Sequence, residues 1–386
     1  MSDKPTDEAV EAPQDVDLDD GDVVDTIDHT EAVAVRPSIP ALVTAVIVVA
    51  AIALTLGLLQ DLSSIIAPIF LTLNLLIAAF PIYTWLVAKR CPRLVASLVT
   101  GLAVFVVLIL GLAAIVWSVT KMVQTLSGYT DQFVAMYEQS IAWLGQFGFD
   151  ESSLLNSLKS ISPSSVLDFA GGLVSGTSAA SAMIVVIIVM IVFMVMDLPS
   201  VGERLRVTQH LHPRFTNSIT AFVTGIRRYW LVTTVFGLIV ALLDGVVLLI
   251  LGVSLPLVWI VLAFITNYIP NVGFVIGLVP PALLALFEKG PVTALIVVIA
   301  YCVLNFLIQS LIQPKFTGDA VGITPTVSFI SLLLWAWVFG ALGALIALPA
   351  TLAVKALLID SDPRLRWVNA FISNEPEAIA PKPSEG

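Results

Sequence analysis

Long apolar runs separated by short polar or Gly- and Pro-rich turns dominate the chain from residue 38 onward. A helix that spans a bilayer needs about 20 mostly apolar residues. Five runs plainly meet this length: 38–59, 64–87, 95–118, 179–196 and 230–252. The C-terminal part adds three more: 256–287, 291–313 and 326–355. The pattern predicts an all-α, polytopic helical integral membrane protein with about eight transmembrane helices.

The run 256–287 has two conceivable paths through the membrane. It is too long for one straight span and contains Pro270, Gly273, Pro280 and Pro281. Proline lacks an N–H donor and interrupts helical hydrogen bonding, so one broken crossing and a re-entrant pair of helices both fit. We favour one broken crossing, because a single re-entrant pair would leave the basic C-terminal segment outside.

Basic residues in the short loops set the orientation, because Lys and Arg concentrate on the cytoplasmic side. Lys89, Arg90 and Arg93 follow the second run, and five arginines lie within 197–229. The stretch after the last run carries Arg364 and Arg366. Eight crossings place all these segments inside, so we expect both termini to be cytoplasmic.

The regions outside the spans differ strongly in composition. Residues 1–35 hold twelve acids and one base without a helical pattern, which predicts a disordered acidic cytoplasmic tail. Residues 36–118 hold helices 1–3, residues 179–358 hold helices 4–8, and residues 359–386 form a cytoplasmic C-terminal tail. Between the two helical parts, residues 119–178 carry apolar side chains at helical spacing, which predicts an extracytoplasmic amphipathic helical insertion.

The sequence lacks the reactive groups of an enzyme or an ATP-driven pump. It has no HExxH, no Cys or His cluster with metal-ligand spacing and no GxxxxGK[ST] loop. Only Asp244 falls well inside a span, whereas an aspartyl protease needs two carboxylates. We therefore expect no enzyme activity, no cofactor, no metal and no nucleic-acid partner. Any uphill transport would need an ion gradient or a partner.

Polar side chains inside the spans are the first candidate functional positions. An ionisable residue there is costly and is a functional candidate by default. Asp244 either binds a cation or proton, or lies near enough to the outer end of its helix to reach interfacial water. Asn305, Gln309 and Gln313 follow at i, i+4 spacing and share one helix face. They either line a solute path or hold helices together.

Helix-breaking positions are the second group of candidates, because discontinuous helices form substrate and ion sites in secondary transporters. The candidates for a substrate path or ion site in 256–287 are Asn267, Pro270, Asn271, Gly273, Gly277, Pro280 and Pro281. A purely structural kink is the alternative. The candidates for a hinge or for helix packing are Pro314, Gly318, Pro325, Gly340, Gly343 and Pro349.

Three stretches, 267–286, 313–325 and 335–349, resemble the autoinducer-2 exporter family of bacterial membrane permeases. The resemblance covers residues 38–370 and includes the sequences FMVMDLP and VTGIRRYWLVTTVFGLIVALLDGVVLLILGVSLPLVW. It implies an eight-span protein of the bacterial cytoplasmic (inner) membrane, without ATPase machinery, that forms homo-oligomers in the lipid bilayer. Asn271, Phe274 and the pair Arg228–Tyr229 depart from the family pattern, which affects the expected substrate and not the fold.

Three functions stay open at this point. The first is a permease that exports a small polar solute or signal without ATP hydrolysis. The second is a sodium (lithium)/proton antiporter, for which Asp244 is the motive and to which some members of the family are linked. The third is a non-transporting membrane scaffold whose acidic tail and outer helices recruit partners.

Overall fold

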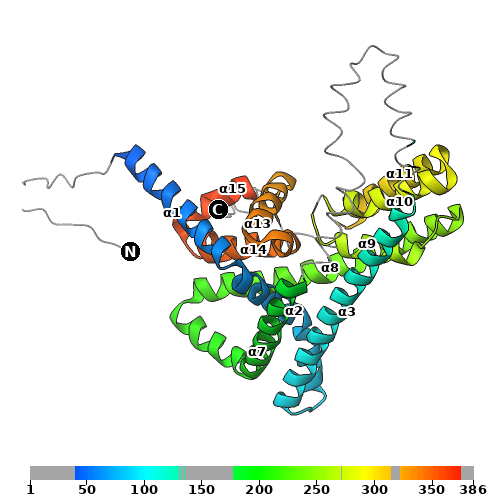
Figure 1. Ribbon diagram of the computed structural model, residues 1–386. Helices are drawn as coiled ribbons and strands as arrows, with labels where there is room; N and C mark the ends of the chain where they lie inside the picture. The colour runs from blue at the N-terminus through cyan, green and yellow to red at the C-terminus, as the bar shows by residue number, and fades with distance from the viewer. Residues whose placement is uncertain are drawn as a thin grey trace, which may run out of the picture. The chain divides into compact units, whose positions relative to one another are not determined.

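The computed structural model describes residues 40–129, 177–270, 272–313 and 322–374, together with Gln132 and Ala135. It confirms the prediction of a polytopic helical membrane protein. Seven helices among the described residues are long and apolar enough to cross a membrane, and Figure 1 shows them along the chain. The predicted tail 1–35 and most of the predicted insertion 119–178 lie outside the described residues.

The chain divides into two units, Met1–Ala51 and Ile52–Gly386. The described part of the first unit is the beginning of helix α1 (Ala41–Asp61). The second unit begins with α2 (Ser63–Ala88), α3 (Arg93–Ser127), α7 (Thr177–Leu211) and α8 (Pro213–Leu251). The helices α2, α3 and α7 share a core cluster made of Leu76, Val104, Ile187, Ile191 and Val195.

After α8 the chain forms a helical hairpin. Helix α9 (Pro256–Thr266) is followed by a turn around Pro270 and then by α10 (Gly273–Lys289), which returns beside α9. The start of α9 and the end of α10 lie side by side, because the backbone N of Ser254 donates a hydrogen bond to Oε2 of Glu288 at 2.9 Å. A continuous helix would hold these two residues about 50 Å apart. We call α9 and α10 hairpin 1.

Hairpin 1 differs from the single broken crossing that the sequence favoured. Its arms have 11 and 17 residues, or about 16 and 25 Å, and each is shorter than the hydrocarbon core of about 30 Å. The segment therefore forms a helical hairpin, the shape that a re-entrant pair requires. Pro280 and Pro281 lie inside α10 and do not break it. The break occurs earlier, around Pro270.

Helix α3 holds the base of hairpin 1. Oγ of Ser118 donates to the carbonyl oxygen of Val258 at 3.0 Å. Tyr129, just beyond α3, stacks on Phe287 with ring centroids 5.8 Å apart and donates to Oε1 of Glu288 at 3.1 Å. Burial, and next the bonded Glu288 carboxylate, raise the pKa of Tyr129 above its ordinary value. The phenol therefore stays protonated and remains a donor.

A second hairpin follows α11 (Pro291–Asn305) and its π-helical continuation η2 (Phe306–Ile312). Helix α13 (Pro325–Leu345) is kinked at Gly340, which has φ 63° and ψ −143°, and α14 (Ala347–Val354) comes next. Oγ1 of Thr351 accepts from Nε1 of Trp335 at 2.9 Å and donates to Oγ of Ser331 at 2.8 Å. The chain thus reverses near Gly340. We call α13 and α14 hairpin 2.

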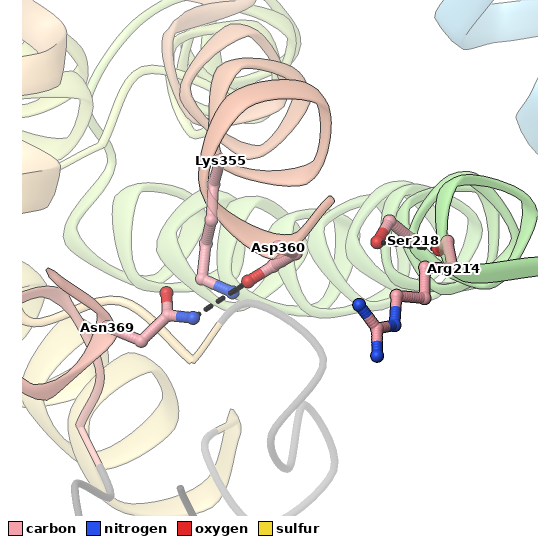
Figure 2. Close-up of polar contacts among 5 residues, drawn as sticks. All are labelled: Arg214, Ser218, Lys355, Asp360 and Asn369. Atoms are coloured by element: carbon pink, nitrogen blue, oxygen red, sulfur yellow. Dashed lines mark hydrogen bonds and ion pairs between the residues drawn. The ribbon is translucent and has the colours of Figure 1, made fainter. Parts of the chain in front are cut away.

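Short helical segments close the base of hairpin 2: η4 (Lys355–Asp360), η5 (Pro363–Val368) and α15 (Asn369–Ile372). Nζ of Lys355 and Nδ2 of Asn369 each donate to the Asp360 carboxylate at 2.8 Å, as Figure 2 shows. The backbone N of Thr324 donates to the carbonyl oxygen of Ile372 at 2.9 Å. The C-terminal segment therefore joins both ends of hairpin 2.

The two hairpins pack into separate apolar cores. Hairpin 1 packs with α8 and α11 in a cluster that includes Leu248, Val258, Trp259, Leu284, Val297 and Tyr301. Hairpin 2 packs with α2 and α8 in a cluster that includes Ala67, Leu71, Ile226, Trp335, Phe339 and Leu348. Helix α8 contributes to both, so it forms the common wall between the hairpins.

The tight reversal of hairpin 2 leads to a stability prediction. A Cβ added at Gly343 would lie 1.7 Å from the carbonyl oxygen of Trp335, so the backbone must shift. Such overpacking costs about 1–3 kcal/mol. We expect Gly343→Ala to lower the thermal unfolding midpoint of the purified protein in detergent. Gly111→Ala in α3, where nothing lies within 4 Å, is the matched control and should leave it unchanged or raise it. Equal midpoints for both variants would contradict the reversal.

Candidate functional site

Small residues on α8 create the space in which hairpin 1 lies. Gly237, Ala241 and Gly245 follow at i, i+4 spacing, a pattern that lets helices approach closely in membranes. A Cβ at Gly237 would lie 2.3 Å from Nδ2 of Asn267, and one at Gly245 would lie 2.2 Å from Cγ1 of Ile260. Helix α9 and the turn of hairpin 1 therefore lie directly on the α8 backbone.

Three amides connect the turn of hairpin 1 to α11 and η2. Nε2 of Gln309 donates to Oδ1 of Asn267 at 2.6 Å and to Oδ1 of Asn305 at 2.8 Å. Nδ2 of Asn305 donates to the carbonyl oxygen of Tyr301 at 2.9 Å. Nδ2 of Asn267 reaches the carbonyl oxygen of Thr233 on α8 at 3.4 Å. This amide network joins three segments that are far apart in the sequence.

A second contact holds the turn on α8. The hydroxyls of Thr234 and Tyr268 are 2.8 Å apart. The ring of Tyr268 also lies 5.4 Å from that of Trp230 and 5.6 Å from that of Phe264. Tyr268 therefore attaches the turn to α8 at a second point, next to Asn267 of the amide network.

A small cavity lies beside the amide network, beneath hairpin 1. Its lining residues come from α8, hairpin 1 and α11, and they are Val240, Asp244, Ala263, Asn267, Phe274, Gly277, Tyr301 and Asn305. The cavity has room for about one water molecule. It is therefore a site for a very small occupant in this conformation.

Two polar atoms of the cavity residues have no hydrogen-bond partner among the described residues. They are Oδ1 of Asp244 and the phenolic oxygen of Tyr301, and both are buried. Asp244 is only 1% exposed, and the ion pairs between described residues do not include it. A buried polar group without a partner is costly. The arrangement therefore favours an occupant that bonds to both oxygens.

The cavity brings together part of the predicted set of site residues. Asp244, Asn267, Gly277 and Asn305 line it, and Gln309 bonds to two of them. Gly277 and the other described candidates of the run 256–287 form parts of the hairpin 1 backbone. Pro270 lies in its turn, Gly273 and Gly277 lie close to the backbone of α9, and Pro280 and Pro281 lie within α10. Gln313 follows η2 and is not among the lining residues.

The predicted hinge residues belong mainly to hairpin 2. Pro325 is the first residue of α13, Gly340 provides the kink with positive φ, and Gly343 lies against Trp335. Pro349 lies within α14. Asn271, Pro314 and Gly318 lie outside the described residues.

Tyr301 is the polar cavity residue that the sequence analysis missed. It lies four residues before Asn305 and eight before Gln309, so it continues the amide face of α11 by one turn. A tyrosine in an apolar run is usually part of a core, and Tyr301 does belong to the core cluster of hairpin 1. Extending the i, i+4 pattern backwards would have identified it.

Comparison with known proteins agrees with this architecture. The family model described as AI-2E family transporter matches residues 42–361. The chain belongs to this family. It is therefore a membrane transporter and not an enzyme, which confirms the resemblance and the absence of enzyme activity inferred from the sequence.

Relatives of this AI-2E family transporter match most of its length. The AI-2 transport protein TqsA of Escherichia coli (strain K12) is 26% identical over 297 residues, which cover 77% of this chain and 86% of TqsA. YhhT from the same strain is 26% identical over 303 residues, covering 76% of this chain and 84% of YhhT. MT0215 of Mycobacterium tuberculosis (strain CDC 1551 / Oshkosh) is 26% identical over 360 residues, covering 88% and 94%.

The amide network of this AI-2E family transporter can be tested by a double-mutant cycle. Asn267→Ala and Gln309→Ala each remove one side of the bond between hairpin 1 and η2. Interhelical hydrogen bonds in membranes are worth about 0.6 kcal/mol on average and up to about 1.7. We expect a coupling free energy in this range from thermal unfolding in detergent. Asn267→Ala with Gln60→Ala, whose amide bonds to Trp337, is the control and should be additive. Additivity in both cycles would contradict the network.

Proposed function

We propose that this AI-2E family transporter moves a monovalent cation in exchange for protons, and that Asp244 is the group that binds both. The observation that carries the proposal is the buried Oδ1 of Asp244, which has no hydrogen-bond partner among the described residues and belongs to a residue lining a cavity with room for about one water molecule. A proton, or a dehydrated sodium or lithium ion, fits such a space. An organic solute needs a pocket of some hundreds of Å³.

Oxygen ligands for a cation are present around Asp244. The side-chain oxygens of Asn267 and Asn305 and the phenol of Tyr301 come from residues that line the same cavity. Both amide oxygens accept hydrogen bonds from Gln309, so a cation would compete with Gln309 for them. Cation entry would therefore loosen the bond between hairpin 1 and η2, which supplies a physical link between occupancy and movement of the hairpin.

We further propose that the two hairpins enter the membrane from opposite sides. Full crossings are made by six helices: α1, α2, α3, α7, α8 and α11 with η2. Hairpin 1 begins and ends on the outer side, and hairpin 2 begins and ends on the inner side. This path puts Lys89, Arg90, Arg93 and the C-terminal bases on the cytoplasmic side, as the charge rule requires. Both termini remain cytoplasmic, and the homo-oligomer implied by the resemblance stays a prediction.

Accessibility of Lys289, the last residue of α10, distinguishes this path from eight crossings. Lys289→Cys in a background with Cys91 and Cys302 replaced by Ser should react with an impermeant maleimide in intact cells. With 256–287 as one crossing, the same position would be cytoplasmic. Lys121→Cys is the outer control. Ser361→Cys is the inner control and should react only after permeabilisation. Protection of position 289 in intact cells would exclude the proposed path.

Exchange activity depends on Asp244 in this proposal. In proteoliposomes with an internal pH dye, a sodium or lithium step should change the internal pH with the full-length protein. Asp244→Asn cannot carry the ionised carboxylate, so we expect a loss of at least about tenfold, equivalent to about 1.4 kcal/mol. Asp197→Asn, an exposed acid paired with Arg204, is the matched control and should retain exchange.

Tyr301→Phe provides a second readout of the same site. It removes one oxygen from the cavity while keeping the ring that packs in the core. We expect a weaker apparent affinity for the cation with a folded, reconstituted protein. Full exchange in Asp244→Asn would rule out the proposed function, whatever the result for Tyr301→Phe.

Export of a small polar solute is the second candidate function. The printed name of TqsA assigns AI-2 transport to that protein, and the amide network gives this chain hydrogen-bonding groups for a polar solute. Such a solute requires hairpin 1 to move away from α8 and η2. Labelled AI-2 that leaves loaded vesicles without any change in pH would favour this function over cation exchange.

A further inference from the structure

The turn between α2 and α3 concentrates three cations in five residues. Lys89 caps the C-terminal end of α2, Arg90 follows it, and Arg93 is the first residue of α3. All three residues are exposed. The ion pairs found between described residues are Arg204–Asp197 and Lys355–Asp360, so these three bases take part in neither.

The backbone fixes the turn in one short conformation. The backbone N of Arg90 donates to the carbonyl oxygen of Val87 at 2.9 Å, and that of Cys91 donates to Leu86 at 3.1 Å. Arg90 has a φ of 65°, a left-handed conformation that residues other than glycine adopt only rarely. Pro92, with φ −54°, leads directly into α3. The three basic side chains therefore leave a defined segment of backbone.

The dipoles of α2 and α3 favour only one of the three positive charges. A cation at the C-terminal end of a helix is favoured by the helix dipole, which suits Lys89. The same dipole disfavours a cation at the N-terminal end, where Arg93 lies. Arg90 lies between the helices and gains from neither. The helix dipoles therefore do not explain the presence of Arg90 and Arg93.

Trp85 favours a position of this turn at the level of lipid headgroups. Its side chain is 61% exposed and lies one turn before Lys89, whose Nζ is 6.0 Å from the ring centroid. Tryptophan is enriched where a membrane meets water, and the cation adds to the attraction of the ring for the polar side. The phosphates nearest to the three bases in a membrane are those of lipids.

We propose that the α2–α3 turn is a binding site for the phosphate of an anionic phospholipid, formed by Lys89, Arg90 and Arg93 with Trp85 as the interfacial anchor. Charge complementarity and membrane depth support this occupant. Basic residues next to a membrane surface attract anionic lipids, and each one strengthens binding by about fivefold. The inference does not depend on which ion or solute the transporter carries.

A site differs from the general excess of positive charge in inner loops. That excess requires only the number of bases, so any three exposed bases on the same side would serve equally well. A site requires these three, binds a limited number of lipids and prefers an anionic headgroup to a zwitterionic one. The experiment therefore compares two sets of three bases.

The test uses the purified full-length protein in a neutral detergent at about 0.15 M salt. Bound phosphatidylglycerol and phosphatidylcholine are counted by native mass spectrometry during titration. We expect saturable binding of phosphatidylglycerol over phosphatidylcholine, weakened at least about tenfold in the variant K89Q/R90Q/R93Q. The matched control R204Q/R206Q/R214Q removes three bases from α7 and α8 and should bind as the unaltered protein does.

Three results would overturn the proposal. The first is unchanged phosphatidylglycerol binding in K89Q/R90Q/R93Q. The second is an equal loss in R204Q/R206Q/R214Q, which would show a general effect of charge. The third is displacement of the lipid by inorganic phosphate at millimolar concentration, which would assign the site to a free anion. If the triple variant does not fold, K89Q/R93Q carries the same test with an expected loss of at least about fivefold.

Discussion

Backbone polar groups in hydrocarbon must find partners within the protein, and the arrangement of the hairpins depends on this requirement. The turn of hairpin 1 meets it locally: the backbone N of Ile269 donates to Thr266, and that of Gly273 donates to Ile269. Asn267 adds a side chain that bonds to the carbonyl oxygen of Thr233 on α8. A reversal without such bonds would leave free carbonyls at membrane depth, so the polar residues near the turn are needed for the fold.

Close packing of hairpin 1 on α8 also encloses the cavity around Asp244. Gly237 and Gly245 bring hairpin 1 against the α8 backbone, and this excludes lipid from Asp244. The carboxylate is then enclosed with Tyr301 and the amides of Asn267 and Asn305 in a space for about one water molecule. Gln309 of η2 donates to the side-chain oxygens of both Asn267 and Asn305. In the proposed function, the structural amides also serve as cation ligands, which would couple cavity occupancy to the position of hairpin 1.

The sequence predicted the helical membrane class, the family and half of the cavity, since apolar length and amide spacing are local features. It did not predict the two reversals. A single hairpin at 256–287 would have placed the C-terminal bases outside, and this argument favoured one broken crossing. In the proposed path, the second reversal at Gly340 cancels that change, but the apolar run from 326 to 355 shows no sign of it except glycines. Tyr301 was missed because its ring fits a core position. Pro280 and Pro281 were expected to interrupt a helix, but both lie inside α10 without breaking it.

Proton release on cation binding tests the central claim most directly. Sodium or lithium is added to the purified protein in lightly buffered detergent, and the pH is recorded. A cation that replaces the proton on Asp244 predicts acidification that saturates at no more than one proton per chain and is absent in Asp244→Asn. Choline chloride at equal ionic strength should cause no change. Equal acidification by sodium in the unaltered protein and in Asp244→Asn, or none in either, would contradict a cation site at Asp244.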